Sequence, residues 1–103
     1  MSLLLEFSMT PLDKGGSLSE FVAPAVGIVD ESGIPYVTGP MGTTLEGEWD
    51  EVMAVVKKCL DGMSQHSGRI SISIRADYRP GRTGRIKSKT DSVERRLQRP
   101  LSR

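Results

Sequence analysis

The sequence predicts an α+β fold, in which a four-stranded antiparallel sheet carries two helices on one face and a further helix follows at the C-terminal end. Two observations lead to this prediction. Apolar residues at alternate positions mark the candidate strands, and segments with helical spacing of apolar residues lie between them. With 103 residues, the chain has the length of one domain, which we expect to span residues 1–103.

The first part of the chain is expected to form a strand and then a helix. Residues 3–9, LLLEFSM, place apolar side chains at every second position, as a strand with one buried face does. Ser17 and Glu20 have the spacing of a capping box, and apolar residues at helical spacing continue from there to Val29. Pro24 lies beyond the first turn, where it removes an amide donor, so we expect a kink or a late start of this helix.

The middle of the chain is expected to form a hairpin and a second helix. Two short strands, at 35–38 and 43–46, are joined through the turn-forming residues 39–42. From Trp49 onward, apolar residues recur at helical spacing and acidic residues cluster in the first turn, where they suit the helix dipole. Gly68 is expected to close the connection that follows.

The last part should contain one more strand and a weaker helix. Apolar and polar residues alternate here, which predicts a half-buried strand: Ile70, Ile72, Ile74 and Ala76 alternate with Arg69, Ser71, Ser73, Arg75 and Asp77. After a basic loop at 79–85, a terminal helix is expected within residues 86–99, ended by Pro100 and leaving 100–103 as a tail. Its apolar seam is too narrow to stand alone, so we expect it to pack on another subunit or on a sheet edge.

The order of these elements, βαββαβ followed by a helix, is that of a ferredoxin-like sandwich. We expect a core between the sheet and the two helices, built from Leu3, Leu5, Phe7, Leu45, Ile70, Ile72 and Ile74 against Val22, Val26, Val29, Val52, Val56 and Leu60. The uncovered face of the sheet should then carry Leu4, Glu6, Ser8, Tyr36, Thr38, Thr44, Glu46, Ser71, Ser73 and Arg75. This face is either solvated or a subunit interface.

Charge is unevenly distributed along the chain. Residues 1–78 hold five basic and eleven acidic side chains, whereas residues 79–103 hold nine basic and two acidic ones. A basic tail on an acidic body more often serves contacts within or between subunits than nucleic acid, which favours aromatic residues among the charges. No apolar run has the length of a membrane span, and the opening residues lack a basic n-region and a cleavage site. We therefore expect a cytoplasmic protein without membrane or nucleic-acid partners.

The residue types of hydrolytic and metal sites are scarce. Cys59 is the single cysteine and falls on the apolar stripe of the second helix, which predicts a small core residue. His66 is the single histidine, and one Cys and one His do not make up a usual metal site or a nucleophilic triad. We therefore expect no catalytic residues, no metal and no cofactor.

Several segments together resemble a known family. They are Pro11, SLSEFVAPAV at 17–26, ESG at 31–33, MGTTLEGEWDEVM at 41–53 and DSVERRL at 91–97. The chain resembles the small thiamine-binding protein family with a ferredoxin-like fold, over residues 3–97. The resemblance implies a short cytoplasmic protein that assembles as a dimer or tetramer and binds thiamine or its hydroxymethylpyrimidine moiety as a ligand.

The chemistry of thiamine suggests which residues would bind it. The aminopyrimidine offers an amine beside ring acceptors, which suits hydroxyls, carboxylates and backbone amides, and the thiazolium cation suits carboxylates and aromatic or thioether surfaces. Residues 41–52 concentrate such groups. The candidate ligand-binding residues are Glu46, Thr43, Thr44, Glu48, Trp49, Met41, Ser17 and Tyr36, with Met9 as a further wall.

Most of these residues have an alternative structural role. The threonines also suit an ordinary strand, Glu48 a helix start, Trp49 a packing anchor and Ser17 the capping box. Glu46 is the strongest candidate, because a carboxylate on a central strand needs a partner. That partner could be a ligand, Arg75 or an arginine of a neighbouring subunit.

The sequence thus favours non-catalytic binding of thiamine or its pyrimidine by an oligomer acting as a carrier, buffer or sensor. The alternative is a structural or regulatory oligomer that docks a protein partner through its open sheet face.

Overall fold

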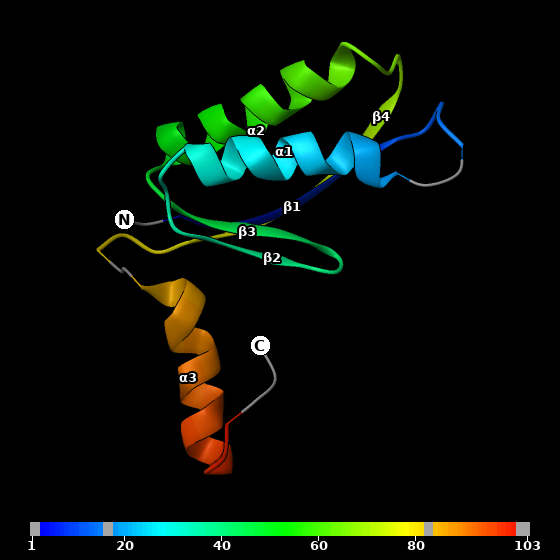
Figure 1. Cartoon of the computed structure of the whole chain (residues 1–103). Coiled ribbons are helices and arrows are strands. Elements are labelled where there is room, and N and C mark those ends of the chain that lie inside the picture. The colour runs from blue at the N-terminus through cyan, green and yellow to red at the C-terminus, as the bar shows by residue number, and fades with distance from the viewer. Residues whose placement is uncertain (1–2, 16–17, 82–83, 101–103) are drawn as a thin grey trace.

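The computed structural model describes residues 3–15, 18–81 and 84–100 and confirms the predicted fold class. The elements are β1 (Leu3–Pro11), α1 (Ser19–Glu31), β2 (Tyr36–Gly39), β3 (Gly42–Gly47), α2 (Trp49–Ser64), β4 (Ile70–Tyr78) and α3 (Arg85–Leu97). The four strands form one antiparallel sheet in the order β2-β3-β1-β4. Helices α1 and α2 lie on one face of this sheet, and α3 lies on the opposite side (Figure 1).

The β2–β3 hairpin turns within two residues, because Gly39 pairs with Gly42. A side chain at Gly42 would bring its Cβ to 2.9 Å from the carbonyl oxygen of Phe7, a distance that real Cβ atoms do not tolerate. Glycine at this position therefore lets the hairpin lie close against β1.

The register of the hairpin corrects one expectation. Tyr36 pairs with Leu45 and Thr38 with Thr43, and directly paired residues share one face of a sheet. Since Leu45 is fully buried under the helices, Tyr36 and Thr38 lie on the helix-covered face. The prediction that both lie on the open face was wrong.

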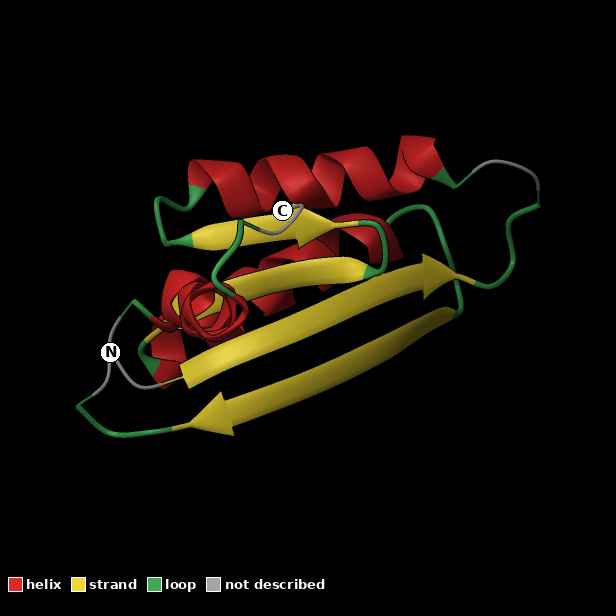
Figure 2. Ribbon diagram, turned by 90° about the horizontal axis from the view of Figure 1, so that it is seen from below, coloured by secondary structure: helices red, strands yellow, loops and turns green. Residues whose placement is uncertain are grey.

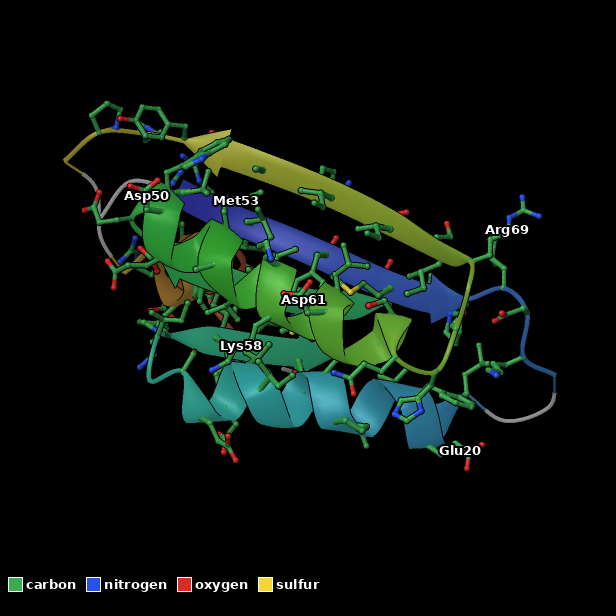
Figure 3. The ribbon with its side chains drawn as sticks, turned by 90° about the horizontal axis from the view of Figure 1, so that it is seen from above. Glu20, Asp50, Met53, Lys58, Asp61 and Arg69 are labelled. Carbon is green, nitrogen blue, oxygen red and sulfur yellow. The ribbon has the colours of Figure 1, made fainter. Side chains whose placement is uncertain are left out.

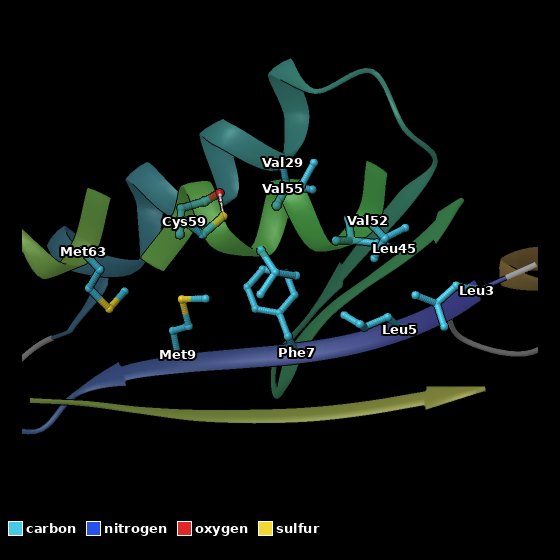
Figure 4. Packing of buried hydrophobic residues seen from close by; sticks show 12 residues of the cluster. Leu3, Leu5, Phe7, Met9, Val29, Leu45, Val52, Val55, Cys59 and Met63 are labelled. Atoms are coloured by element: carbon cyan, nitrogen blue, oxygen red, sulfur yellow. Dashed lines mark hydrogen bonds between the residues drawn. The ribbon is translucent and has the colours of Figure 1, made fainter. Parts of the chain in front are cut away.

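The core lies between β1, β3 and the two helices (Figure 4). Its buried hydrophobic residues are Leu3, Leu5, Phe7, Met9, Ala25, Val29, Leu45, Val52, Val55, Val56, Cys59 and Met63. The predicted core role of Cys59 is confirmed. Its thiol donates to the carbonyl of Ala25 across the α1–α2 contact at 3.5 Å, and burial raises the pKa of this thiol.

The expected burial of β4 was wrong in part. Helices α1 and α2 pack on β1, β2 and β3, and Figure 3 shows β4 beyond α2 at the edge of the sheet. Ile72 and Ile74 consequently remain 38% and 46% exposed, and Val22 on α1 is also 38% exposed.

Helix α1 is continuous from Ser19 to Glu31 and includes Pro24. Its N-cap residue is Leu18, without a side-chain hydrogen bond. Ser17, and with it the predicted capping box, lies outside the described residues.

Helix α3 starts one residue earlier than expected, at Arg85, and follows Gly84, whose φ of 67° is the left-handed conformation that glycine adopts most readily. The helix packs against β3 and extends away from the sheet (Figure 1). Figure 2, which looks onto the open face, shows α3 end-on over one end of the strands.

Candidate ligand-binding site

A cavity of about 350 Å³ opens where β1 runs past the tip of the β2–β3 hairpin. Protein pockets for small molecules measure about 300 to 1,000 Å³, so this cavity suits a molecule of one or two small rings. It is lined by Phe7, Ser8, Met9, Thr10, Val22, Ala25, Val26, Thr38, Gly39, Pro40, Met41, Gly42, Thr43 and Met63.

The backbone of β1 forms one polar edge of this cavity. The pairing of β1 with β3 ends at Phe7 and Thr43, although β1 continues. The amide of Leu12 donates to the carbonyl of Arg69 at 2.8 Å. In an antiparallel pair this means that the backbone N–H and C=O groups of even-numbered β1 residues point to β4, and those of odd-numbered residues point to β3. The N–H and C=O of Met9 therefore point to the side where β3 has ended. They offer a ligand one donor and one acceptor in the plane of the sheet.

Hydroxyls and thioethers supply the remaining chemistry of the cavity. The hydroxyls of Thr38 and Thr43 lie 3.3 Å apart, within hydrogen-bond distance. Met9 and Met63 are buried at the same end of the core (Figure 4). Met41 on the hairpin turn is 86% exposed and forms a rim. The described residues that line the cavity carry no charged side chain, so the cavity favours a neutral polar ring over an ion.

Glu46 lies apart from this cavity, at the other end of β3. Its side chain points to the open face, yet the residue is only 3% exposed. The carboxylate accepts the backbone amide of Arg85 at 3.0 Å and that of Ile86 at 3.3 Å. Glu46 thus caps the start of α3, where amides have no partner within the helix and the dipole favours negative charge.

Arg75, the alternative partner that the sequence offered to Glu46, bonds instead to the carboxylate of Glu6 at 3.2 Å. The Glu6–Arg75 pair is exposed on the open face.

The side chain of Arg85 strengthens the attachment of α3. The residue is 2% exposed, and its guanidinium donates from Nη1 to the carboxylate of Asp77 and from Nη2 to the carbonyl of Asp77, both at 2.8 Å. The start of α3 is therefore fixed to β3 through Glu46 and to β4 through Asp77.

The eight predicted ligand-binding residues are not brought together. Met41 and Thr43 line the cavity. Thr44 faces the open side of the sheet, beside Leu4, Glu6, Arg75, Ala76 and Asp77. Glu48 and Trp49 are exposed where α2 begins, with Trp49 54% exposed. Ser17 lies outside the described residues.

Tyr36, the remaining candidate, contacts α1 rather than the cavity. Its hydroxyl donates to the carboxylate of Asp30 at 2.7 Å. This hydrogen bond holds the pKa of Tyr36 above its ordinary value of 10.0, and it ties β2 to the end of α1.

Sequence reasoning missed three polar residues of the cavity wall, namely Ser8, Thr10 and Thr38, and the apolar Met63. For Thr38 a signal was present. In a hairpin that turns within two residues, positions 38 and 43 must pair and share a face. The others are brought to the cavity by the ends of β1 and α2, which no local pattern reveals.

In residues 3–15, 18–81 and 84–100, no three His, Cys, Asp or Glu side chains gather in positions that could hold a metal ion. None of the helices in these residues is both long and apolar enough to cross a membrane.

Comparison with known proteins gives consistent matches. The model of the family described as "Thiamine-binding protein" matches residues 5–94. A UPF0045 protein of Mycobacterium bovis is 43% identical over 101 residues, covering 97% of this chain and 99% of the relative. A UPF0045 protein of Synechocystis is 32% identical over 99 residues, covering 95% of this chain and 82% of the relative.

Solved structures give matches over nearly the same length of the chain. A hypothetical protein of Methanocaldococcus jannaschii matches with a TM-score of 0.81 and 28% identity, over 89% of this chain and 95% of the other. A Thermotoga maritima protein with a proposed role in thiamine biosynthesis or salvage matches with a TM-score of 0.79 and 27% identity, over 90% of this chain and 99% of the other. The chain belongs to the thiamine-binding protein family.

Proposed function

We propose that this chain is a non-catalytic binder of thiamine or its hydroxymethylpyrimidine moiety, and that the pyrimidine occupies the cavity beside the hairpin tip. The observation that supports this most is the edge of β1 at Met9, which lies beyond the pairing with β3, is paired with no other described strand on that side and borders a cavity of suitable size. We place the protein in the cytoplasm, where it acts as a carrier, buffer or sensor.

The aminopyrimidine ring matches the Met9 edge in hydrogen-bonding pattern. Its amine is a donor and the adjacent ring nitrogen an acceptor, so the amine donates to the C=O of Met9 and the ring nitrogen accepts from its N–H. Two residues of antiparallel strands exchange the same pair of hydrogen bonds. The hydroxyls of Thr38 and Thr43 lie on the hairpin wall, where they can bond the remaining polar atoms of the ring.

The thiazolium ring is proposed to lie at the mouth of the cavity. A permanent cation loses hydration when it is buried, and the described lining offers it no carboxylate. The exposed thioether of Met41 provides a soft, polarisable contact at the rim. Free hydroxymethylpyrimidine should consequently bind nearly as well as thiamine, because the pyrimidine makes most of the contacts.

The composition of the cavity wall supports the proposal of binding without catalysis. Among the described residues that line it, hydroxyls and thioethers occur without a histidine, carboxylate or lysine that could activate them as nucleophiles.

The alternative function, docking of a protein partner through the open sheet face, has weaker support. That face carries the exposed Glu6–Arg75 ion pair and small polar residues, whereas protein interfaces are anchored by desolvated aromatic and apolar side chains. Partner docking is therefore our second choice.

The experiment compares two threonines that are adjacent on β3 and face opposite sides of the sheet. Thr43→Val removes a hydroxyl from the cavity, and Thr44→Val removes one from the open face as the matched control. Binding of thiamine, hydroxymethylpyrimidine and the isolated thiazole alcohol is measured by calorimetry and thermal shift. We expect Thr43→Val to weaken pyrimidine binding by about three- to tenfold, the value of one hydrogen bond, and Thr44→Val to leave it unchanged.

The proposal is wrong if thiamine and the free pyrimidine both fail to bind at millimolar concentration. It is also wrong if the two variants lose affinity equally, because the ligand would then lie elsewhere.

A further inference from the structure

A second cavity, of about 430 Å³, lies between the start of α1 and the end of α2. Figure 3 shows Glu20 at the start of α1, beside the end of α2. The described residues that line this interhelical cavity belong to the two helices and to the two positions that follow α2, and none of them belongs to the sheet. It shares Ala25 and Met63 with the cavity beside the hairpin tip. Its volume is in the range of small-molecule pockets.

The base and one wall of the interhelical cavity are apolar and polarisable. Cys59 and Met63 are buried there, at 1% and 6% exposure, and Phe21 forms a half-buried wall. Sulfur-containing and aromatic side chains make favourable contacts with soft organic groups. The cavity therefore offers a surface for the alkyl part of a small molecule.

The ring of Phe21 already attracts a cation from within the chain. The ammonium nitrogen of Lys14 lies 5.8 Å from the centroid of this ring, within the reach of a cation–π interaction. Lys14 is itself exposed, so an ammonium group reaches the ring from the solvent side. The same ring can receive the ammonium group of a ligand.

The end of α2 adds negative potential to the interhelical cavity. The last carbonyls of a helix have no amide donor within it and carry the negative end of the helix dipole, which favours cations. The last turn of α2, which the structure describes in full, contains no basic side chain. The carbonyl of Met63 accepts the amide of His66 at 3.0 Å and keeps a second lone pair.

The start of α1 contributes further acceptors. Glu20 is the one carboxylate among the described lining residues, which include no lysine or arginine, and it offsets the positive end of the α1 dipole. Pro24, which also lines the cavity, has no amide. The carbonyl of Glu20 consequently does not receive the helical hydrogen bond that another residue at position 24 would donate.

We propose that the interhelical cavity is a binding site for a compact organic cation of the ammonium class. Its alkyl groups contact Phe21 and Met63, and its charge lies between Glu20 and the end of α2. The charge of the domain favours the same sign of ligand, because residues 1–78 hold eleven acidic and five basic side chains. This site does not depend on the proposed pyrimidine cavity.

Choline and its neutral carbon isostere, in which a quaternary carbon replaces the nitrogen, test the proposal in the wild-type chain. Both ligands have the same shape, and neither contains a pyrimidine, so their binding does not report on the first cavity. Calorimetry at low ionic strength measures both. We expect choline to bind in the millimolar range and the isostere to bind at least about fivefold more weakly, because the aromatic ring and the carboxylate both act on the charge.

Substitutions of Phe21 separate the effect of the ring from that of apolar bulk. Phe21→Leu should weaken choline binding by about two- to fivefold, the value of an exposed cation–π contact, and leave the isostere unchanged. Phe21→Trp keeps an aromatic face and should bind choline at least as well as the wild type. Circular dichroism melting confirms that both variants are folded.

Substitutions of charged residues test the field in the cavity. Glu20→Gln should weaken choline binding by about two- to fivefold at low salt and by less at high salt. Glu31→Gln, at the other end of α1, is the matched control and should not change it. Lys14→Gln should tighten choline binding by about two- to fivefold, because it removes the native cation beside the ring.

Three outcomes would overturn the proposal. The first is that choline fails to bind at high millimolar concentration to both the wild type and Lys14→Gln. The second is equal binding of choline and its neutral isostere, which would show that the cavity selects apolar shape and not charge. The third is equal loss of affinity in Glu20→Gln and Glu31→Gln, which would place the cation elsewhere.

Discussion

The carboxylate of Glu46 accepts the backbone amide of Arg85 at 3.0 Å, across 39 positions of sequence. This hydrogen bond, with the one from Ile86, makes a side chain of a central strand the cap of a helix that follows much later. It explains how a glutamate on the open sheet face can be buried, and it commits that carboxylate to structure rather than to a cationic ligand.

Replacing Glu46 should therefore release α3 and leave ligand binding intact. Glu46→Ala removes a buried acceptor of two amides, which should lower the free energy of unfolding by about 1–3 kcal/mol. Glu46→Gln keeps one acceptor oxygen and should cost less. Amide hydrogen exchange would show faster exchange in the first turn of α3, while pyrimidine binding measured by calorimetry stays at the wild-type level.

Glu6→Gln is the matched control for Glu46→Ala, because Glu6 is on the neighbouring strand and the same face but in an exposed ion pair. Its loss should change stability by about 0–1 kcal/mol. Loss of pyrimidine binding in Glu46→Gln, with exchange in α3 unchanged, would contradict the capping role.

The sequence predicted the elements of the fold well, because each strand and helix has its own apolar periodicity. It predicted the surroundings of particular residues less well, for reasons that differ. The faces of Tyr36 and Thr38 depended on the length of the hairpin turn. The exposure of Ile72 and Ile74 depended on how far α2 reaches across the sheet, and their alternation is the same whether the helix covers them or not.

The residues of the candidate site were predictable only in part, because closeness in sequence was the only guide to which side chains lie together. Thr43 and Met41 were found because they lie in one polar segment of sequence. Glu46 lies three residues from Thr43, and this proximity in sequence suggested one site. A strand extends about 3.3 Å per residue and alternates faces, so the structure places the two side chains on opposite sides of the sheet.

Asp13 gives the protein a predictable response to acid. Its carboxylate accepts hydrogen bonds from the hydroxyl of Ser67 and from the amide of Gly68 at 2.9 Å, and these bonds lower the pKa of Asp13 below its ordinary value of 3.8. The folded state thus binds the proton less readily than the unfolded state. The stabilisation is present above about pH 3.8 and is lost as pH falls through the folded-state pKa.

Asp13→Asn should remove this part of the pH dependence. We expect Asp13→Asn to have a lower melting temperature than wild type at neutral pH, and the difference in melting temperature to become smaller in strong acid. Thermal melts across the acid range measure this difference. Asp61→Asn, which breaks only an exposed pair with Lys57, is the control. A constant difference between Asp13→Asn and wild type at every pH would exclude the proposed linkage.

Cys59 should be unreactive in the folded protein. The residue is 1% exposed, and burial raises the pKa of its thiol, so both access and the thiolate fraction are reduced. A chromogenic disulfide reagent should label it slowly in native buffer and promptly in denaturant. Prompt labelling under native conditions would show that the α1–α2 contact opens readily.

Pro24 should limit the stability of α1. Within a helix, proline cannot donate to the carbonyl four residues earlier, here that of Glu20, and costs about 3 kcal/mol relative to alanine. Part of this cost is offset, because proline also lowers the conformational entropy of the unfolded chain, which stabilises the folded state by about 0.4–1 kcal/mol. Pro24→Ala should therefore raise the free energy of unfolding by about 2 kcal/mol, as measured by urea denaturation.

Gly27→Ala in the same helix is the comparison. Its new Cβ would meet no atom within 4 Å, and the expected gain is about 0.5–1 kcal/mol from helix propensity alone. If Pro24→Ala gains no more than Gly27→Ala, the missing amide of Pro24 is not what limits this helix, and the proline is accommodated without cost.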